Sequence, residues 1–122
     1  MGVTERRQRQ KEEVRSAILT TAWQMVKSEG WQSLSIRRIA EAIEYSVPVI
    51  YDHFTNKEAI LMEFAREGFR LLTAKMERAA KKHPAPEDKI KAMADAYWNF
   101  AFGHKEHYQL MFGLGMACCE TS

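Results

Sequence analysis

The 122-residue chain contains few cysteines and no long apolar run. Its two cysteines, Cys118 and Cys119, are adjacent, so they close no loop and give no disulfide framework. No apolar stretch approaches the roughly 18 residues typical of a membrane span. The basic N-terminus lacks the apolar segment of a secretory signal. These absences argue against a disulfide-rich secreted protein and against a membrane protein, and we expect a cytoplasmic protein with two free thiols.

Common enzyme signatures are absent as well. The sequence has no GxSxG, Walker, HExxH or CxxC pattern and no pair of carboxylates in an obvious apolar setting. His104 and His107 are three residues apart, a spacing that suits a metal pair, but no second group of ligands accompanies them. We therefore expect neither an enzyme nor a bound metal or other cofactor.

Charge is nearly balanced along the chain, with a net charge of +2. One local bias stands out, because residues 1–11 carry four basic side chains (Arg6, Arg7, Arg9 and Lys11) against Glu5. An unpaired basic arm would suit attraction to nucleic-acid phosphates. A merely solvated tail is an equally good interpretation of this segment.

Apolar residues recur at helical spacing through most of the chain, which predicts an all-α fold. The long helices are expected from near Arg9 to Glu29, from a Thr55–Glu58 capping box to about Lys82, from Pro86 to Gly103, and as a shorter piece from Lys105 to Phe112. Gly30 is the expected C-cap of the first. In the third, the inward positions are expected to be Ile90, Met93, Ala94, Tyr97, Trp98 and Ala101.

The stretch from Ser33 to Glu58 predicts two short helices joined by a tight turn. Ile36, Ile39, Ala40 and Ile43 have the spacing of one buried helix face, and Ser35 precedes them as a cap. Ser46 and Pro48 begin the second helix, whose inward face is Ile50 and Phe54. Helices this short need packing partners. A helix–turn–helix of this kind can place its second helix in the major groove of DNA.

Taken in order, these features resemble the TetR/AcrR family of bacterial one-component transcription regulators. The resemblance rests on Glu29-Gly30 at the end of a helix, Leu34 to Ala40, Ser46, Tyr51, Phe54, and Asn56-Lys57-Glu58 before a long helix. It spans about Val14 to Leu61. It implies a three-helix DNA-binding head with a basic N-terminal arm over residues 1–57, followed over 58–122 by a connector helix and part of a helical regulatory domain.

The same resemblance implies a repressor that binds a palindromic operator in double-stranded DNA as a homodimer and is released by a small-molecule effector. The DNA-binding residues it implies are Ser35, Arg37, Arg38, Ser46, Val47, Pro48, Val49, Tyr51, His53 and Lys57. The effector pocket is expected to include Phe64, Met93, Tyr97, Trp98, Phe102, Tyr108 and Met111. For each aromatic residue the alternative is an ordinary helical core position.

Two departures from the family pattern keep a second hypothesis open. Glu44 stands in the turn where the family usually has glycine, and Val47 and Val49 make the base-facing edge apolar. Tyr51 could be a packing aromatic, and Arg37–Arg38 a solvated face. The alternative is therefore a helical ligand- or protein-binding module whose truncated or altered head no longer binds DNA specifically.

Overall fold

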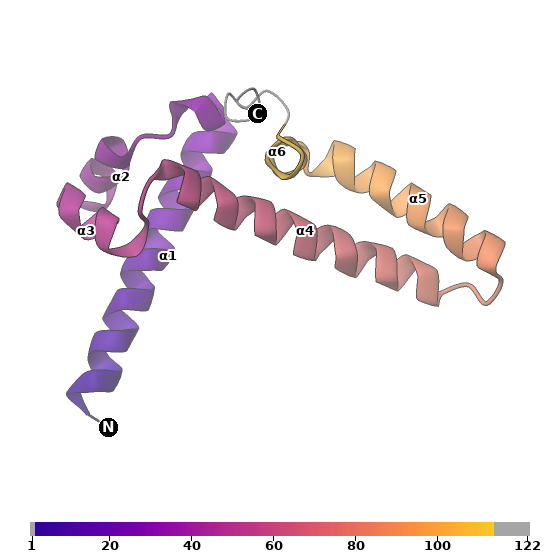
Figure 1. Cartoon of the computed structure of the whole chain (residues 1–122), viewed down its shortest axis with the longest axis horizontal. Coiled ribbons are helices and arrows are strands. Elements are labelled where there is room, and N and C mark those ends of the chain that lie inside the picture. Colours follow the sequence, from indigo (N-terminus) through magenta and orange to yellow (C-terminus); the bar gives the residue numbers. More distant parts are fainter. Residues whose placement is uncertain (1, 114–122) are drawn as a thin grey trace. The chain divides into compact units, whose positions relative to one another are not determined.

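The computed structural model describes residues 2–113, which form helices and no strand (Figure 1). The elements are α1 (Val3–Glu29), a 3-10 turn (Trp31–Ser33), α2 (Ile36–Ile43), α3 (Val47–His53), α4 (Lys57–Lys81), α5 (Pro86–Gly103) and α6 (Lys105–Met111). The expected all-α fold is confirmed. No described helix combines the length and apolar character needed to cross a bilayer. Cys118 and Cys119 lie outside the described residues.

Two compact units divide the chain, Met1–Ile60 (the first unit) and Leu61–Ser122 (the second unit). The division falls inside α4, three residues beyond the boundary expected from the sequence. Assigning DNA binding to one unit and regulation to the other stays a prediction at this point.

Helix α1 is longer than expected, and the expectation of a basic arm before it is wrong. It begins at Val3 rather than near Arg9, so all four N-terminal basic residues lie on the helix. Arg, Gln, Glu and Lys are good helix formers, and no glycine or proline interrupts the segment after Gly2. A hydrogen bond from Gln8 Nε2 to Glu12 Oε1, 3.4 Å long, joins adjacent turns. The C-terminal half of α1 buries Ile18, Ala22, Met25 and Val26, and Gly30 ends it with a φ of 91°.

The two short helices form as the sequence predicts. Ser35 caps α2, since its hydroxyl accepts a 3.3 Å hydrogen bond from the Arg38 backbone N–H. Ser46 precedes α3, but its side chain makes no cap bond, so the start of this helix depends on Pro48 in the first turn. Ile50 is fully buried on the inner face of α3. Figure 1 shows α2 and α3 joined by a tight turn beside α1.

The cap of α4 differs from the expected capping box. Asn56 Oδ1, not the Thr55 hydroxyl, accepts a hydrogen bond of 2.9 Å from the Ala59 N–H. The helix begins at Lys57, which places Asn56 directly before it in the cap position. Asparagine satisfies an unpaired helix-start N–H as well as threonine does.

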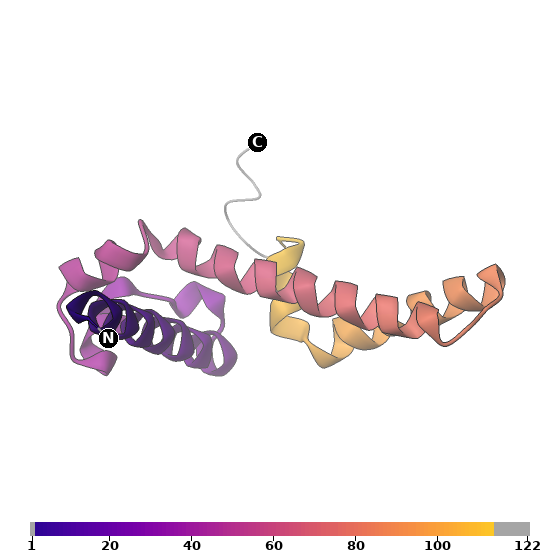
Figure 2. The ribbon, with the colours of Figure 1, turned by 90° about the horizontal axis from the view of Figure 1, so that it is seen from below.

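In the second unit, α5 runs back along α4 and α6 closes the end of the pair (Figures 1 and 2). The core is the buried cluster of Leu72, Phe100 and Met111, one residue from each of the three helices. Gly68 allows this approach, because a Cβ there would lie 2.5 Å from the Met111 Sδ. Gly68 therefore lets α6 lie close against α4.

The inward face of α5 is rotated from the one expected. Trp98 and Ile90 were predicted to face inward, but they are 64% and 68% exposed, and Phe100 is fully buried. Phe112, at the end of α6, is 44% exposed. Apolar residues occur around much of α5, so its spacing fits more than one face, and packing against α4 and α6 selects the face that contains Phe100.

Candidate DNA-binding interface

All ten residues predicted to contact DNA lie within the first unit, and Lys57 is also the first residue of α4. They follow the helix–turn–helix in order: the cap and first turn of α2, the cap and first turn of α3, the rest of α3, and the start of α4. Ser35, Arg37 and Arg38 belong to the first group, Ser46, Val47, Pro48 and Val49 to the second, Tyr51 and His53 to the third, and Lys57 to the last. The fold thus brings the predicted residues onto one compact unit.

The outward face of α3 carries Pro48 and Tyr51, and Tyr51 is 51% exposed. This exposure favours a surface role for Tyr51 over a packing role. Val47 and Val49 are half-buried, and so is His53. Asp52, which no sequence motif singled out, is also exposed on α3, and its carboxylate would be repelled by DNA phosphates. Its position next to Tyr51 on a helix is the signal that could have identified it.

Arg38 is already engaged within the first unit. Its Nη2 lies 2.7 Å from Glu29 Oε2 and its Nη1 3.3 Å from Glu29 Oε1. The hydrogen bonds from Arg38, and then its charge, lower the pKa of the Glu29 carboxyl, and the same contacts raise the pKa of Arg38. The pair is at the surface, where such bridges contribute little to stability. Arg37 is exposed beside it and is therefore the more available cation for a phosphate.

The turn between α2 and α3 is built on a left-handed residue. Glu44 has φ 61° and ψ 41°, so this position takes the conformation for which glycine is favoured. The Tyr45 N–H then bonds to the Ala40 carbonyl at 3.0 Å, closing the end of α2. The turn keeps its geometry without glycine, at the cost of backbone strain at Glu44.

Replacing Glu44 by glycine is expected to raise the free energy of unfolding by about 1 kcal/mol, because glycine adopts the left-handed conformation without strain. Urea denaturation followed by circular dichroism measures this change. A matched control is Glu41→Gly on the regular, exposed part of α2, which should lower stability by about 1 kcal/mol. If both substitutions raised the free energy of unfolding, or both lowered it, the strain assigned to Glu44 would be contradicted.

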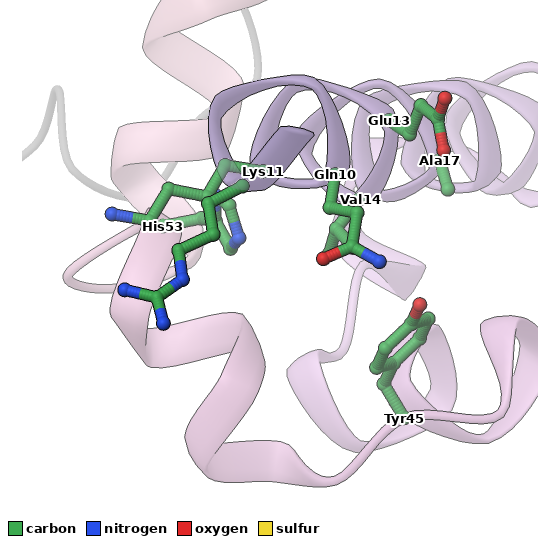
Figure 3. Close-up of a pocket in the computed structure, with 8 residues that line it drawn as sticks. Gln10, Lys11, Glu13, Val14, Ala17, Tyr45 and His53 are labelled. Atoms are coloured by element: carbon green, nitrogen blue, oxygen red, sulfur yellow. The ribbon is translucent and has the colours of Figure 1, made fainter. Parts of the chain in front are cut away.

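A groove runs between the N-terminal half of α1 and the helix–turn–helix (Figure 3). This α1 groove has a volume of about 570 Å³ and is lined by Arg7, Gln10, Lys11, Glu13, Val14, Ala17, Tyr45 and His53. Figure 3 shows Lys11 and His53 close together at one end and Tyr45 below the middle of α1. Next to it, the guanidinium of Arg15 stacks on the Phe54 ring at 4.5 Å. Of these lining residues, the sequence singles out His53 as a DNA contact, and Arg7 and Lys11 only as members of the basic N-terminal segment.

In the second unit, the residues predicted to line an effector pocket are only partly brought together. Tyr97 and Tyr108 pack against the core cluster, and their hydroxyls are 3.0 Å apart. This hydrogen bond, followed by burial, raises the pKa of Tyr97. Trp98 and Phe102 instead lie on the exposed face of α5, with ring centroids 5.1 Å apart. The remaining predicted residues are buried (Phe64 and Met111) or half-buried (Met93).

The two histidines of α6 and its cap have separate environments. His104 stacks on Phe100 with centroids 4.8 Å apart, and its pKa is lowered by burial and then by the charge of Lys75. His107 is buried, with its Nε2 3.5 Å from Glu67 Oε2. Within residues 2–113, no group of three or more potential metal ligands comes together.

Comparisons with known proteins identify relatives of this chain. Residues 18–64 match the model of a protein family described as bacterial regulatory proteins, tetR family. Among curated proteins, the chain is similar to the tetracycline repressor protein class C of Escherichia coli, with 38% identity over 47 residues that make up 38% of this chain and 22% of the repressor. It is also similar to the HTH-type transcriptional activator FasR of Mycolicibacterium smegmatis, with 22% identity over 102 residues, 84% of this chain and 47% of FasR.

Solved structures share the fold. A protein with unknown function from Rhodococcus sp. RHA1 has a TM-score of 0.71 and 32% identity, over 85% of this chain and 54% of that one. The putative regulatory protein SCO4313 has a TM-score of 0.74 and 24% identity, over 90% of this chain and 52% of its own. The chain therefore spans about half the length, or less, of the proteins it matches.

Proposed function

The chain belongs to the tetR family of bacterial regulatory proteins, and from this premise we propose that it represses transcription by binding a palindromic operator in double-stranded DNA as a homodimer. The observation that carries the proposal is the arrangement of α2 and α3, with Pro48 and Tyr51 exposed on the outward face of α3. The 38% identity of the head to a repressor, against 22% to an activator over a longer span, favours repression.

The contacts divide into those that position the protein and those that select a sequence. Arg37 and Lys57 supply charge for phosphates, and the Tyr51 hydroxyl can donate a hydrogen bond to one. Ser35, His53 and Ser46 extend these backbone contacts at the helix ends. Val47, Pro48 and Val49 offer no hydrogen-bonding side chain, so they discriminate bases only through contact with thymine methyl groups. We therefore expect an operator with thymine at the positions facing the start of α3.

Release from DNA is proposed to follow binding of a small molecule to the second unit. Tyr97 and Tyr108 give an otherwise apolar cluster a pair of hydroxyls, which suits a mostly apolar ligand with one polar group. An effector can release DNA only if it binds the DNA-free conformation more tightly than the DNA-bound one. Trp98 and Phe102, exposed together on α5, are not part of this proposed pocket.

A second candidate function is a helical ligand- or protein-binding module with a head that does not bind DNA specifically. The apolar Val47 and Val49 favour it because they make no hydrogen bond to a base, and the acidic Asp52 favours it because its carboxylate repels phosphates. Salt titration of binding to DNA from upstream of the gene, with random DNA as competitor, separates the two. Steep salt dependence with preference for the upstream DNA supports a regulator, and weak, sequence-blind binding supports the alternative.

Tyr51→Phe and Lys57→Ala are expected to weaken DNA binding across all sequences, since each removes a contact to the backbone rather than to a base. Tyr51→Phe should lower affinity roughly tenfold, because it removes a hydrogen bond to a charged group. Lys57→Ala should reduce the slope of log affinity against log salt by about 1. Fluorescence anisotropy at several salt concentrations measures both effects.

The matched control for Lys57→Ala is Lys91→Ala, which removes the same charge from an exposed position in the second unit. It should leave both affinity and salt slope nearly unchanged. Unchanged affinity for Tyr51→Phe and Lys57→Ala would count against this interface.

A further inference from the structure

We propose that Arg7 and Lys11 of α1, together with His53 at the end of α3, bind DNA phosphates in the α1 groove and extend the DNA contact beyond the helix–turn–helix. This inference rests on the proposed function and adds to it a contact site on a different helix. It also assigns a role to the basic N-terminal segment, which the structure shows to be helical.

The first turns of α1 have no packing role. Every residue from Gly2 to Glu13 is exposed, and Figure 1 shows this half of α1 extending past α2 and α3. The helical part of this stretch, residues 3–13, contains 11 residues, about 16 Å of helix. A bare helix of this length is marginal in water without a partner, so a binding partner would stabilise it.

The basic residues of this segment fall on two different faces. Arg7 and Lys11 are four residues apart and both line the α1 groove, on the side of the helix that continues into Val14 and Ala17. Arg6 and Arg9 point elsewhere and flank a separate small hollow near the N-terminus. One pair of cations therefore faces the helix–turn–helix, and an equal pair does not.

The α1 groove is lined both by Arg7 and Lys11 and by a residue of α3. His53 is the last residue of α3, and Figure 3 shows it beside Lys11. Arg7 lines the same groove. Within the described part of the chain, no hydrogen bond or ion pair engages the Arg7 or Lys11 side chain. Glu13 is the one carboxylate lining this groove, so Arg7 and Lys11 give its lining a net positive charge. The adjoining hollow, which shares Lys11 and His53, adds Arg15 but also Glu12 and Asp52.

The occupant that fits is the DNA backbone. Side chains four apart on a helix have Cβ atoms about 5–6 Å apart, so Arg7 and Lys11 can hold phosphates of one strand. The groove borders α3, whose insertion into the major groove would bring the flanking backbone to this side of the unit. A free phosphate ion has the same chemistry, and the experiment distinguishes the two.

The test compares two double variants of the full chain, Arg7→Ala/Lys11→Ala and Arg6→Ala/Arg9→Ala. Both remove two positive charges from the same exposed stretch of helix, and alanine preserves helicity. Binding to a duplex from upstream of the gene is measured by fluorescence anisotropy between 50 and 200 mM salt. Circular dichroism confirms equal helix content.

Arg7→Ala/Lys11→Ala loses two phosphate contacts, so its slope of log affinity against log salt concentration should be smaller by about 2. Between 50 and 200 mM salt, the loss of affinity should therefore be roughly tenfold smaller for this variant than for the wild type. Arg6→Ala/Arg9→Ala should change the slope by less than half as much. His53→Ala should reduce affinity at all salt concentrations and add little to the effect of Arg7→Ala/Lys11→Ala, because all three residues hold the same backbone segment.

This inference would be overturned if the two double variants had equal salt slopes while the wild-type affinity for the upstream duplex depended steeply on salt. The proposed function would then remain intact. Wild-type protein that shows no preference for the upstream duplex would overturn both. A third arm titrates inorganic phosphate at constant ionic strength and follows backbone amide shifts by NMR. Shifts at Arg7 and Lys11 at millimolar phosphate, with no difference between the variants on DNA, would show a free-anion site instead.

Discussion

Replacing Phe100 by alanine is expected to lower the free energy of unfolding of the second unit by about 3–5 kcal/mol. Phe100 is fully buried, packs with Leu72 and Met111, and stacks on His104. Its removal would leave a cavity where α4, α5 and α6 meet, and the surrounding helices can collapse only partly into it. Urea denaturation monitored by circular dichroism gives the change from the shift in midpoint.

Trp98→Ala is the matched control, since it truncates a larger aromatic side chain two residues earlier on α5. Trp98 is 64% exposed, so this substitution should change stability by no more than about 0.5 kcal/mol. The order of the two effects tests which face of α5 is buried. A larger loss for Trp98→Ala would mean that the helix is rotated from the orientation described.

Ile50→Ala is expected to lower the stability of the first unit by about 2–5 kcal/mol and to reduce DNA binding through loss of folded protein. Ile50 is fully buried on the inner face of α3, so its side chain is not available to DNA. Denaturation in urea measures the stability, and anisotropy with the upstream duplex measures binding. Reduced binding should be restored when a stabilising osmolyte raises the folded fraction.

The neighbouring Tyr51→Phe variant gives the opposite combination. Tyr51 is half-exposed and its ring is retained, so stability should stay within about 0.5 kcal/mol of the wild type while DNA affinity falls. Substitutions at two adjacent residues of α3 would thus affect different quantities, stability for Ile50→Ala and DNA affinity for Tyr51→Phe. If Ile50→Ala left stability unchanged, α3 would not be packed through Ile50, and the placement of the outward face would be wrong.

Local signals in the sequence predicted most of the helix–turn–helix. Ser35 before an apolar i, i+3, i+4 pattern, and Pro48 in the first turn of α3, each specify a helix start through backbone chemistry that acts within a few residues. Gly30 likewise marked the end of α1 through its positive φ. Such signals need no tertiary contact, which is why these boundaries agree with the structure.

Competing local signals produced the errors. Thr55 and Asn56 are both good caps, and only the start of α4 at Lys57 shows that Asn56 makes the bond. The basic charge of residues 1–11 suggests an arm, and no apolar periodicity before Arg9 predicts a helix there, yet the residues of this segment favour a helix that extends α1. Periodicity detects a buried face, so it cannot detect a helix that buries nothing.

The sequence by itself determined the all-α fold, the order of the helices and the residues of the helix–turn–helix, because caps, prolines and apolar spacing act over short distances. Only the tertiary structure decided that Phe100 rather than Trp98 is buried, and that Lys11 of α1 lies beside His53 of α3 in one groove. Both outcomes depend on which helix faces meet. That choice is made by packing between residues tens of positions apart, and it leaves no local pattern in the chain.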